Sequence, residues 1–459
     1  MFTKITKNSF KKHSKVLLAL VLPIVITQFS QSALGVVDAI MAGQVSALDL
    51  AAVSIGAGMW MPIFLLASGT LIATTPLIGE VVGRNEHEHV AHITQQSLWT
   101  AIAIGVVGFV LVNISPLLFE PMGVPENIRP IARSYLHWVS FGFPAMTCYA
   151  VLRCYSEALG RPQPVTLISI IGLLADIPLN YIFIYGKFGL PAMGGAGCGV
   201  ATALVLWINV LLLALYLSYS KHHTFASTRF FYGFNSPNKQ QISKLLKLGV
   251  PIGVAIFFEA SLFSMAALVI SALGEIAVAA HQIALSVSTQ IFMIPLSISM
   301  ALTIMVSNRF GENNLPLLKE VITTGLIWSF SISLLSVVGL YIWRADIAMA
   351  FGDNKQVQQI AIGLLIYAMG YQVFDAWQVS IAGILRGIQD TSMPMIITFF
   401  CYWLVALPLG IYLVRYTDIG VQGFWMALVT GLSLAAILLS VRLKHQLKQV
   451  TIKNAKSVS

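Results

Sequence analysis

The chain has 459 residues, of which 57% are hydrophobic and only 10% are charged, and its formal net charge is +9. A soluble domain of this composition would expose large apolar patches to water, so the composition excludes a soluble globular protein and predicts a polytopic membrane protein. The four cysteines have no paired spacing, and we interpret them as small apolar residues rather than disulfides or metal ligands.

Apolar stretches of about 20 residues, the length that a helix needs to cross a bilayer, recur along the whole chain. They predict roughly twelve spans, centred near residues 27, 65, 105, 142, 175, 208, 258, 293, 331, 370, 405 and 432. These segments lack the alternating polar faces of a membrane barrel, so the expected fold is an all-α bundle.

Basic residues are distributed unequally between the two sides of these spans. Assigning alternate connections to alternate sides places about 21 of the 27 Lys and Arg residues on the side of both chain ends and of the connection at 221–243. This bias predicts a multi-pass protein of the inner (plasma) membrane with both termini in the cytoplasm. The positive charge is then topological, and no nucleic-acid partner is expected.

The chain repeats itself at a spacing of 228 residues: LLALVLPI at 17–24 aligns with LLKLGVPI at 245–252, so Pro23 meets Pro251. The repeat predicts an N-lobe at 1–220, a cytoplasmic linker at 221–243 and a C-lobe at 244–459. Six spans per lobe give both lobes the same orientation. Two such pseudo-symmetric six-helix bundles around a central cavity are typical of transporters, and a duplicated channel or structural scaffold is the alternative.

Four acids fall well inside predicted spans: Asp38, Asp176, Glu259 and Asp375. A charge at the bilayer centre costs about 2.5–3.5 kcal/mol or more, and we expect no Lys or Arg at a comparable depth to compensate it. Either each acid is permanently protonated and hydrogen-bonded, or the acids bind H⁺ or Na⁺. The absence of basic partners favours the second interpretation, with Na⁺ at Glu259, Asp375 or Asp38.

Helical spacing adds polar groups to these acids. Tyr371 lies one turn before Asp375, and Asn180 lies one turn after Asp176, so each pair shares a helical face. Pro178 is expected to kink its helix and free backbone carbonyl groups, and Thr202 on the next span adds a hydroxyl group. Aromatic and methionine side chains near the C-lobe acids are candidate contacts for flat organic cations: Phe257, Phe258, Met265, Tyr371 and Trp377.

Several stretches together resemble the multidrug and toxic compound extrusion family, in particular its NorM-type branch. They are VVDAIMAG in the first span, ATTPLIGE, RCYSEALG, DIPLNYIFIYG, FFEAS, AAHQI, and FDAWQ followed by LRGIQDTSMP. The resemblance implies twelve helices in two lobes and export of organic cations in exchange for Na⁺ or H⁺, without another cofactor. It assigns cation binding to Glu259 and Asp375 with Tyr371 nearby in the C-lobe.

In the N-lobe, the resemblance assigns cation binding to Asp38, with Asn180 and Thr202 at matching positions. Asp176 departs from the family pattern, because many NorM-type chains have Asn there. A second N-lobe carboxylate leaves open which lobe carries the coupling ion and whether that ion is a proton.

Three other classes of protein are weaker interpretations. An intramembrane enzyme is not expected, because the acids occupy unequal positions in the two repeats; Glu259, for example, aligns with Gln31. A lipid-linked oligosaccharide flippase of similar architecture would need arginines for pyrophosphate, and a passive channel does not explain the unequal acids. No P-loop motif indicates ATP hydrolysis. We therefore expect a monomeric secondary multidrug exporter surrounded by membrane lipids.

Overall fold

The computed structural model describes residues 5–231 and 233–458, and all regular elements in these two ranges are helices. The first half contains α1 (Lys7–Val45), α2 (Ala47–Leu71), α3 (Thr74–Gly83), α4 (His87–Ile114), η1 (Ser115–Leu118), α5 (Arg129–Ser140), α6 (Phe143–Ala158), α7 (Gln163–Tyr185), α8 (Ala196–Tyr219) and α9 (His223–Ala226). The second half contains α10 (Lys239–Ser271), α11 (Glu275–Gly311), α12 (Leu315–Ala350), α13 (Lys355–Gly387), α14 (Ser392–Phe399), η2 (Phe400–Ala406), α15 (Leu407–Tyr416) and α16 (Val421–Val458).

Eleven segments of the described chain are long and apolar enough to cross a membrane as helices. The remaining expected span, near residue 142, consists of α5 and α6, which are separated at Phe141 and Gly142. Pro144 lies in the first turn of α6, where proline fits a helix start but could not continue a preceding helix. The predicted all-α membrane fold is confirmed, and one span is broken.

The repeat is visible in the helix bounds. α2 begins at Ala47 and α11 begins at Glu275, so the two helix starts are 228 residues apart, the spacing of the sequence repeat. The turns that follow also match, because Asn85 and Asn313 both have positive φ angles, 61° and 53°. Asparagine tolerates this left-handed conformation better than most residues. The two halves therefore share the backbone conformation of this turn.

Packing divides the chain into two compact units. One unit, which we call the N-unit, is Pro23–Gly253; the other, the C-unit, combines Met1–Leu22 with Val254–Ser459. The divisions fall beside Pro23 and Pro251, the prolines inside α1 and α10. The start of each of these helices thus packs with the other repeat, whereas the predicted lobe boundaries 1–220 and 244–459 remain a prediction from the sequence.

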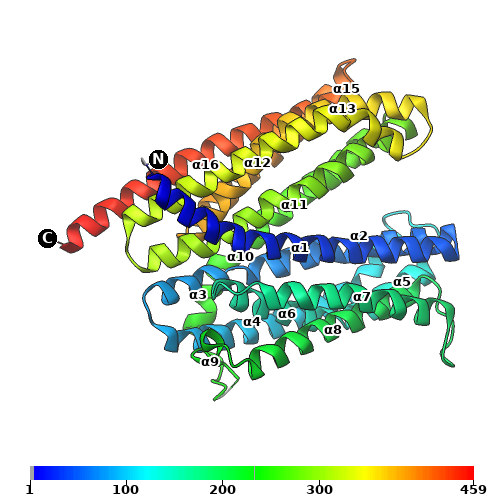
Figure 1. Cartoon of the computed structure of the whole chain (residues 1–459). Helices are drawn as coiled ribbons and strands as arrows, with labels where there is room; N and C mark the ends of the chain where they lie inside the picture. Colours follow the sequence, from blue (N-terminus) through cyan, green and yellow to red (C-terminus); the bar gives the residue numbers. More distant parts are fainter. Residues whose placement is uncertain (1–4, 232, 459) are drawn as a thin grey trace. The chain divides into compact units, whose positions relative to one another are not determined.

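In the N-unit, α7 packs along α8, and α4 packs along α6 (Figure 1). Two adjacent glutamines of α4 attach the connection that leads to α10. The Gln95 side chain donates to the Phe230 carbonyl oxygen at 2.7 Å, and Gln96 accepts a hydrogen bond from the Asn238 N–H at 2.6 Å. The predicted linker therefore contains a segment that is tied to the N-unit.

The first half of α10 packs against α2 through glycines. A Cβ atom on Gly249 would lie 2.1 Å from the Thr70 carbonyl oxygen, and one on Gly253 would lie 2.5 Å from the Leu66 carbonyl oxygen. Small residues four apart allow two membrane helices to approach this closely.

Replacing Gly249 with Ala is expected to lower the apparent Tm of the purified protein, because backbone must move to admit the methyl group at a cost of about 1–3 kcal/mol. Gly58→Ala on α2 is the matched control, since a Cβ atom there meets nothing within 4 Å. Thermal unfolding followed by intrinsic fluorescence measures both variants. Equal Tm values for Gly249→Ala and Gly58→Ala would contradict the close packing of α10 on α2.

In the C-unit, α13 is surrounded by α11, α12 and α16. The first segment of α1 also belongs to this unit, and its attachment to α12 is polar. The Trp328 indole N–H donates to the Ser14 hydroxyl at 2.9 Å, and the His13 ring lies 3.2 Å from a Glu320 carboxylate oxygen. The first segment of α1 is thus attached to α12 by polar side-chain contacts.

Candidate functional site

Four of the predicted site residues meet in the N-unit, on α1, α7 and α8. The Asn180 side-chain N–H₂ donates to Oδ1 of Asp38 at 2.8 Å and to Oδ2 of Asp176 at 2.9 Å. The Thr202 hydroxyl donates to Oδ2 of Asp38 at 2.9 Å. Both carboxylates and the amide are buried, with at most 6% of each residue exposed. We call Asp38, Asp176, Asn180 and Thr202 the N-unit acid cluster.

Close packing of α7 on α8 brings this cluster together. Gly172 has no side chain, and a Cβ atom there would lie 2.4 Å from the Asn209 side-chain oxygen on α8. At the other end, a Cβ atom on Gly197 would lie 2.7 Å from the Phe183 carbonyl carbon. These glycines let the two helices approach, so that Thr202 reaches an acid on α1 while Asp176 and Asn180 share one face of α7.

The N-unit acid cluster contains two buried oxygens for which no described residue is a hydrogen-bond partner: Oδ1 of Asp176 and Oδ1 of Asn180. A buried polar atom without a hydrogen-bond partner is less stable than the same atom in water. Two carboxylates that share one amide also lack a compensating positive charge. Carboxylate, amide and hydroxyl oxygens are the ligands that hard cations prefer, and a carboxylate can equally accept a proton. The geometry is suited to binding a small cation or H⁺.

The other predicted residues gather in the C-unit: Glu259 on α10, with Tyr371 and Asp375 on α13. Asp375 is fully buried, and neither of its carboxylate oxygens makes a regular hydrogen bond within the described chain. Glu259 is partly exposed and acts electrostatically on both Asp375 and Tyr371. We call these three residues together with Tyr402 of η2 the C-unit acid cluster.

Tyr402 is a member of this cluster that the sequence did not indicate. Its hydroxyl group is buried without a partner among the residues described, and both acids of the C-unit act on it. It lies in η2, a stretch of π-helix within the eleventh predicted span. Such widened turns occur frequently at functional sites. The sequence carries no clear signal for a π-helix, so only the structure could add Tyr402.

One buried arginine acts electrostatically on Glu259, although we expected no Lys or Arg at the depth of the four acids. Arg386, in the last turn of α13, is only 8% exposed, interacts electrostatically with Glu259 and donates to the Ser299 hydroxyl at 3.0 Å. In the N-unit, Arg153 forms an ion pair with Glu157 at 2.8 Å. A long arginine side chain can extend from a helix end along apolar surface, so its Cα position alone misplaces its charge.

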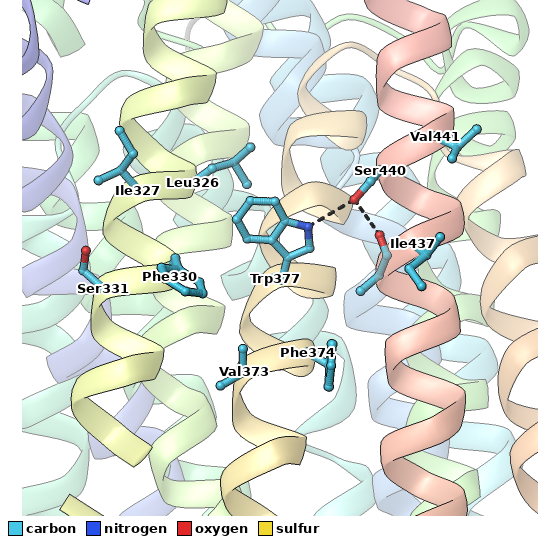
Figure 2. A pocket seen from close by; sticks show the side chains of 11 residues that line it. Leu326, Ile327, Phe330, Ser331, Val373, Phe374, Trp377, Ile437, Ser440 and Val441 are labelled. Atoms are coloured by element: carbon cyan, nitrogen blue, oxygen red, sulfur yellow. Dashed lines mark hydrogen bonds between the residues drawn. The ribbon is translucent and has the colours of Figure 1, made fainter. Parts of the chain in front are cut away.

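The predicted aromatic surface is corrected in part. Trp377 lies two positions from Asp375 on α13, which is about 200° around the helix, and it points between α12 and α16 (Figure 2). It therefore faces away from the C-unit acid cluster. Tyr371 instead packs edge-on against Phe263 and Trp425, each with a ring-centroid distance of 6.1 Å. These two rings come from α10 and α16 and were not predicted.

Two others of the predicted aromatic residues form a separate contact. The rings of Phe257 and Phe258 lie 6.3 Å apart, and Phe258 packs on Phe399 at 4.9 Å. The Phe258 carbonyl oxygen accepts a hydrogen bond from the Trp403 indole N–H at 3.3 Å. These contacts fix the backbone next to Glu259, while Met265, one of the predicted contacts, is half-buried on the same helix.

Two repeated helical units that bury acids inside their spans are typical of a polytopic membrane transporter. The MatE family model matches the chain twice, at residues 23–182 and 251–412, and so covers both repeats. The chain belongs to the MatE family. Members of this family are non-enzymatic transporters and need no cofactor.

Relatives support this membership along nearly the full length. The chain is 46% identical over 443 residues to the probable multidrug resistance protein NorM of Acinetobacter baylyi, covering 96% of this chain and 98% of the relative. It is 40% identical over 444 residues to the multidrug resistance protein MdtK of Yersinia pseudotuberculosis, covering 95% and 96%.

Solved structures show the same fold. A multidrug resistance MATE transporter of the MOP superfamily in an outward-facing conformation matches with a TM-score of 0.87 at 22% identity, covering 98% of this chain and all of that one. A MATE crystal structure in a bent conformation matches with a TM-score of 0.88 at 21% identity over the same shares. Twelve helices in two bundles are thus confirmed as the fold class.

Proposed function

We propose that the protein is a secondary multidrug exporter of the cytoplasmic membrane, with both termini in the cytoplasm, that exchanges organic cations for Na⁺ or H⁺. The N-unit acid cluster takes the coupling cation, and the C-unit acid cluster takes the exported cation. The observation that carries this proposal is the pair of carboxylates, Asp38 and Asp176, which share the amide of Asn180 without a positive partner among the residues described. The names of the relatives support drug export as the activity.

The surroundings of the C-unit acid cluster support an organic cation there. Glu259 and Asp375 provide negative charge, and the rings of Tyr371, Phe263 and Trp425 pack together in the same unit. Aromatic rings and carboxylates together recognise flat cations, because both attract positive charge while the rings also remove apolar surface from water. The two acids of the cluster outnumber Arg386, the arginine that acts electrostatically on Glu259, so this site is not suited to an anionic pyrophosphate substrate.

Export of ethidium from liposomes that contain the purified protein tests the function. A Na⁺ gradient is imposed without a pH gradient, and a pH gradient is imposed without Na⁺. We expect one of the two gradients to move the dye against its concentration and the opposite gradient to reverse its direction, because antiport links the two fluxes. Dye movement that neither gradient drives would overturn the proposal, and the productive gradient identifies the ion.

A further inference from the structure

A cavity of about 630 Å³ lies in the C-unit between α12, α13 and α16 (Figure 2). Large apolar side chains dominate its walls, among them Leu326, Phe330, Phe374, Trp377, Ile437 and Val441. Its volume is within the range of about 300–1,000 Å³ that small-ligand sites occupy. We call this cavity the α13 groove.

The main polar groups of the groove are bonded within its own wall. The Trp377 indole N–H donates to the Ser440 hydroxyl at 3.1 Å, and that hydroxyl donates to the Ala436 carbonyl oxygen at 2.6 Å (Figure 2). The groove therefore suits an apolar occupant, which makes dispersion contacts with its walls and needs no hydrogen bonds.

The groove is separate from the C-unit acid cluster, because Trp377 and Asp375 point to opposite sides of α13. Its walls belong to three helices long enough to span a membrane. Several of its side chains are strongly exposed, including Phe330 at 49% and Ile437 at 58%. Hydrocarbon chains of the bilayer are the apolar molecules that such a wall meets in every state of the protein.

Basic residues continue the groove toward one end of the unit. On α16, Lys444 and Lys448 lie on the same helical face as Ile437 and Val441. Both lysines are exposed. On α12, Lys319 precedes Leu326 by seven residues, which is two helical turns, so the two residues lie on the same face of the helix. At about 1.5 Å per residue, Lys444 and Lys448 lie roughly 6 and 12 Å along the axis from Ser440.

These basic residues gather at the same end of the unit. The antiparallel neighbours α12 and α13 are joined directly, so α12 begins where α13 ends. Arg442 of α16 pairs with Asp390, just beyond the end of α13, at 2.6 Å. Lys319, Lys444 and Lys448 therefore lie at the end where the membrane surface and lipid phosphates would meet the groove.

We propose that the α13 groove binds an acyl chain of an anionic phospholipid whose phosphate pairs with Lys319, Lys444 and Lys448. The bound chain presses on the back of α13, the helix that carries Tyr371 and Asp375 on its other side. Basic residues near the ends of membrane helices attract anionic lipid headgroups, and an apolar groove between those helices adds specificity for the chain. This site is independent of the compound that is exported.

Quenching of tryptophan fluorescence by brominated lipid tests this site in the full-length protein in detergent. Bromine quenches an indole only on contact, so phosphatidylglycerol brominated in mid-chain reports an acyl chain beside Trp377. We expect saturable quenching that is smaller in Trp377→Phe than in the wild type, because eight other tryptophans remain, and weaker binding of phosphatidylcholine with the same chains. The double variant Lys444→Gln, Lys448→Gln is expected to weaken the apparent affinity for phosphatidylglycerol about tenfold.

The double variant Lys355→Gln, Arg415→Gln is the matched control, because it removes two exposed basic charges from the same unit, at the start of α13 and just before α16, the ends opposite to Lys444 and Lys448. Equal binding of both lipids, or saturable quenching of the same amplitude in Trp377→Phe as in the wild type, would overturn the proposal. Displacement of the brominated lipid by ethidium in competition would also overturn it, since the groove would then be a substrate site.

Discussion

Replacing Asp38 with Asn is expected to slow gradient-driven export at least about tenfold. Asp38 accepts hydrogen bonds from both Asn180 and Thr202, so it is the acid that connects α7 and α8 to α1. Asparagine keeps the size but removes one of two negative charges, and a loss of about 1.4 kcal/mol in cation binding lowers affinity tenfold. We expect the initial rate of ethidium export from liposomes to fall by at least this factor at limiting ion concentration.

A milder variant and a control variant accompany the Asp38→Asn prediction. Thr202→Val removes one hydroxyl donor and is expected to cost about 1 kcal/mol, a several-fold rise in the half-saturating ion concentration. Asp49→Asn is the matched control: Asp49 is also buried and accepts a hydrogen bond from the Gly195 N–H at 2.7 Å, but it lies outside the N-unit acid cluster. It is expected to lower the Tm and leave ion dependence unchanged. Wild-type ion dependence in Asp38→Asn would contradict the assignment.

The bundle could be predicted from the sequence because a membrane helix must satisfy its own backbone hydrogen bonds, so each span leaves a continuous apolar stretch. The repeat could also be predicted from the sequence, because Pro23 and Pro251, like Asn85 and Asn313, occupy matching positions in the two halves. The boundaries of the two compact units, which fall beside Pro23 and Pro251, could not be predicted from the sequence. Which unit a helix segment joins depends on contacts between distant parts of the chain.

The same distinction applies to the candidate sites. The pairs Asp176 with Asn180 and Tyr371 with Asp375 follow from one helical turn, and the structure places the first pair in a hydrogen-bonded cluster. Tyr402 and Arg386 enter only through tertiary packing. Trp377 and Asp375 lie two residues apart on one helix, so their nearly opposite faces follow from helical spacing alone.

Glu259→Gln is expected to weaken the binding of a cationic dye, because the C-unit acid cluster loses a carboxylate while Arg386 keeps its positive charge. A Kd for ethidium at least about tenfold higher than wild type, equivalent to about 1.4 kcal/mol, is the expected result in a fluorescence titration of the purified protein. Asp390→Asn, which removes an acid paired with Arg442, is the control and is expected to leave this Kd unchanged.

Adding Arg386→Gln to Glu259→Gln separates two roles for Glu259. If Glu259 attracts the dye directly, the double variant still binds weakly, because the attracting carboxylate is gone. If Glu259 only neutralises Arg386, removing both charges restores binding. A double-mutant cycle measures this coupling, since each single variant removes one partner of the same interaction. We expect the double variant to stay at least several-fold weaker than wild type, and full restoration would reassign Glu259 from substrate binding to the support of Arg386.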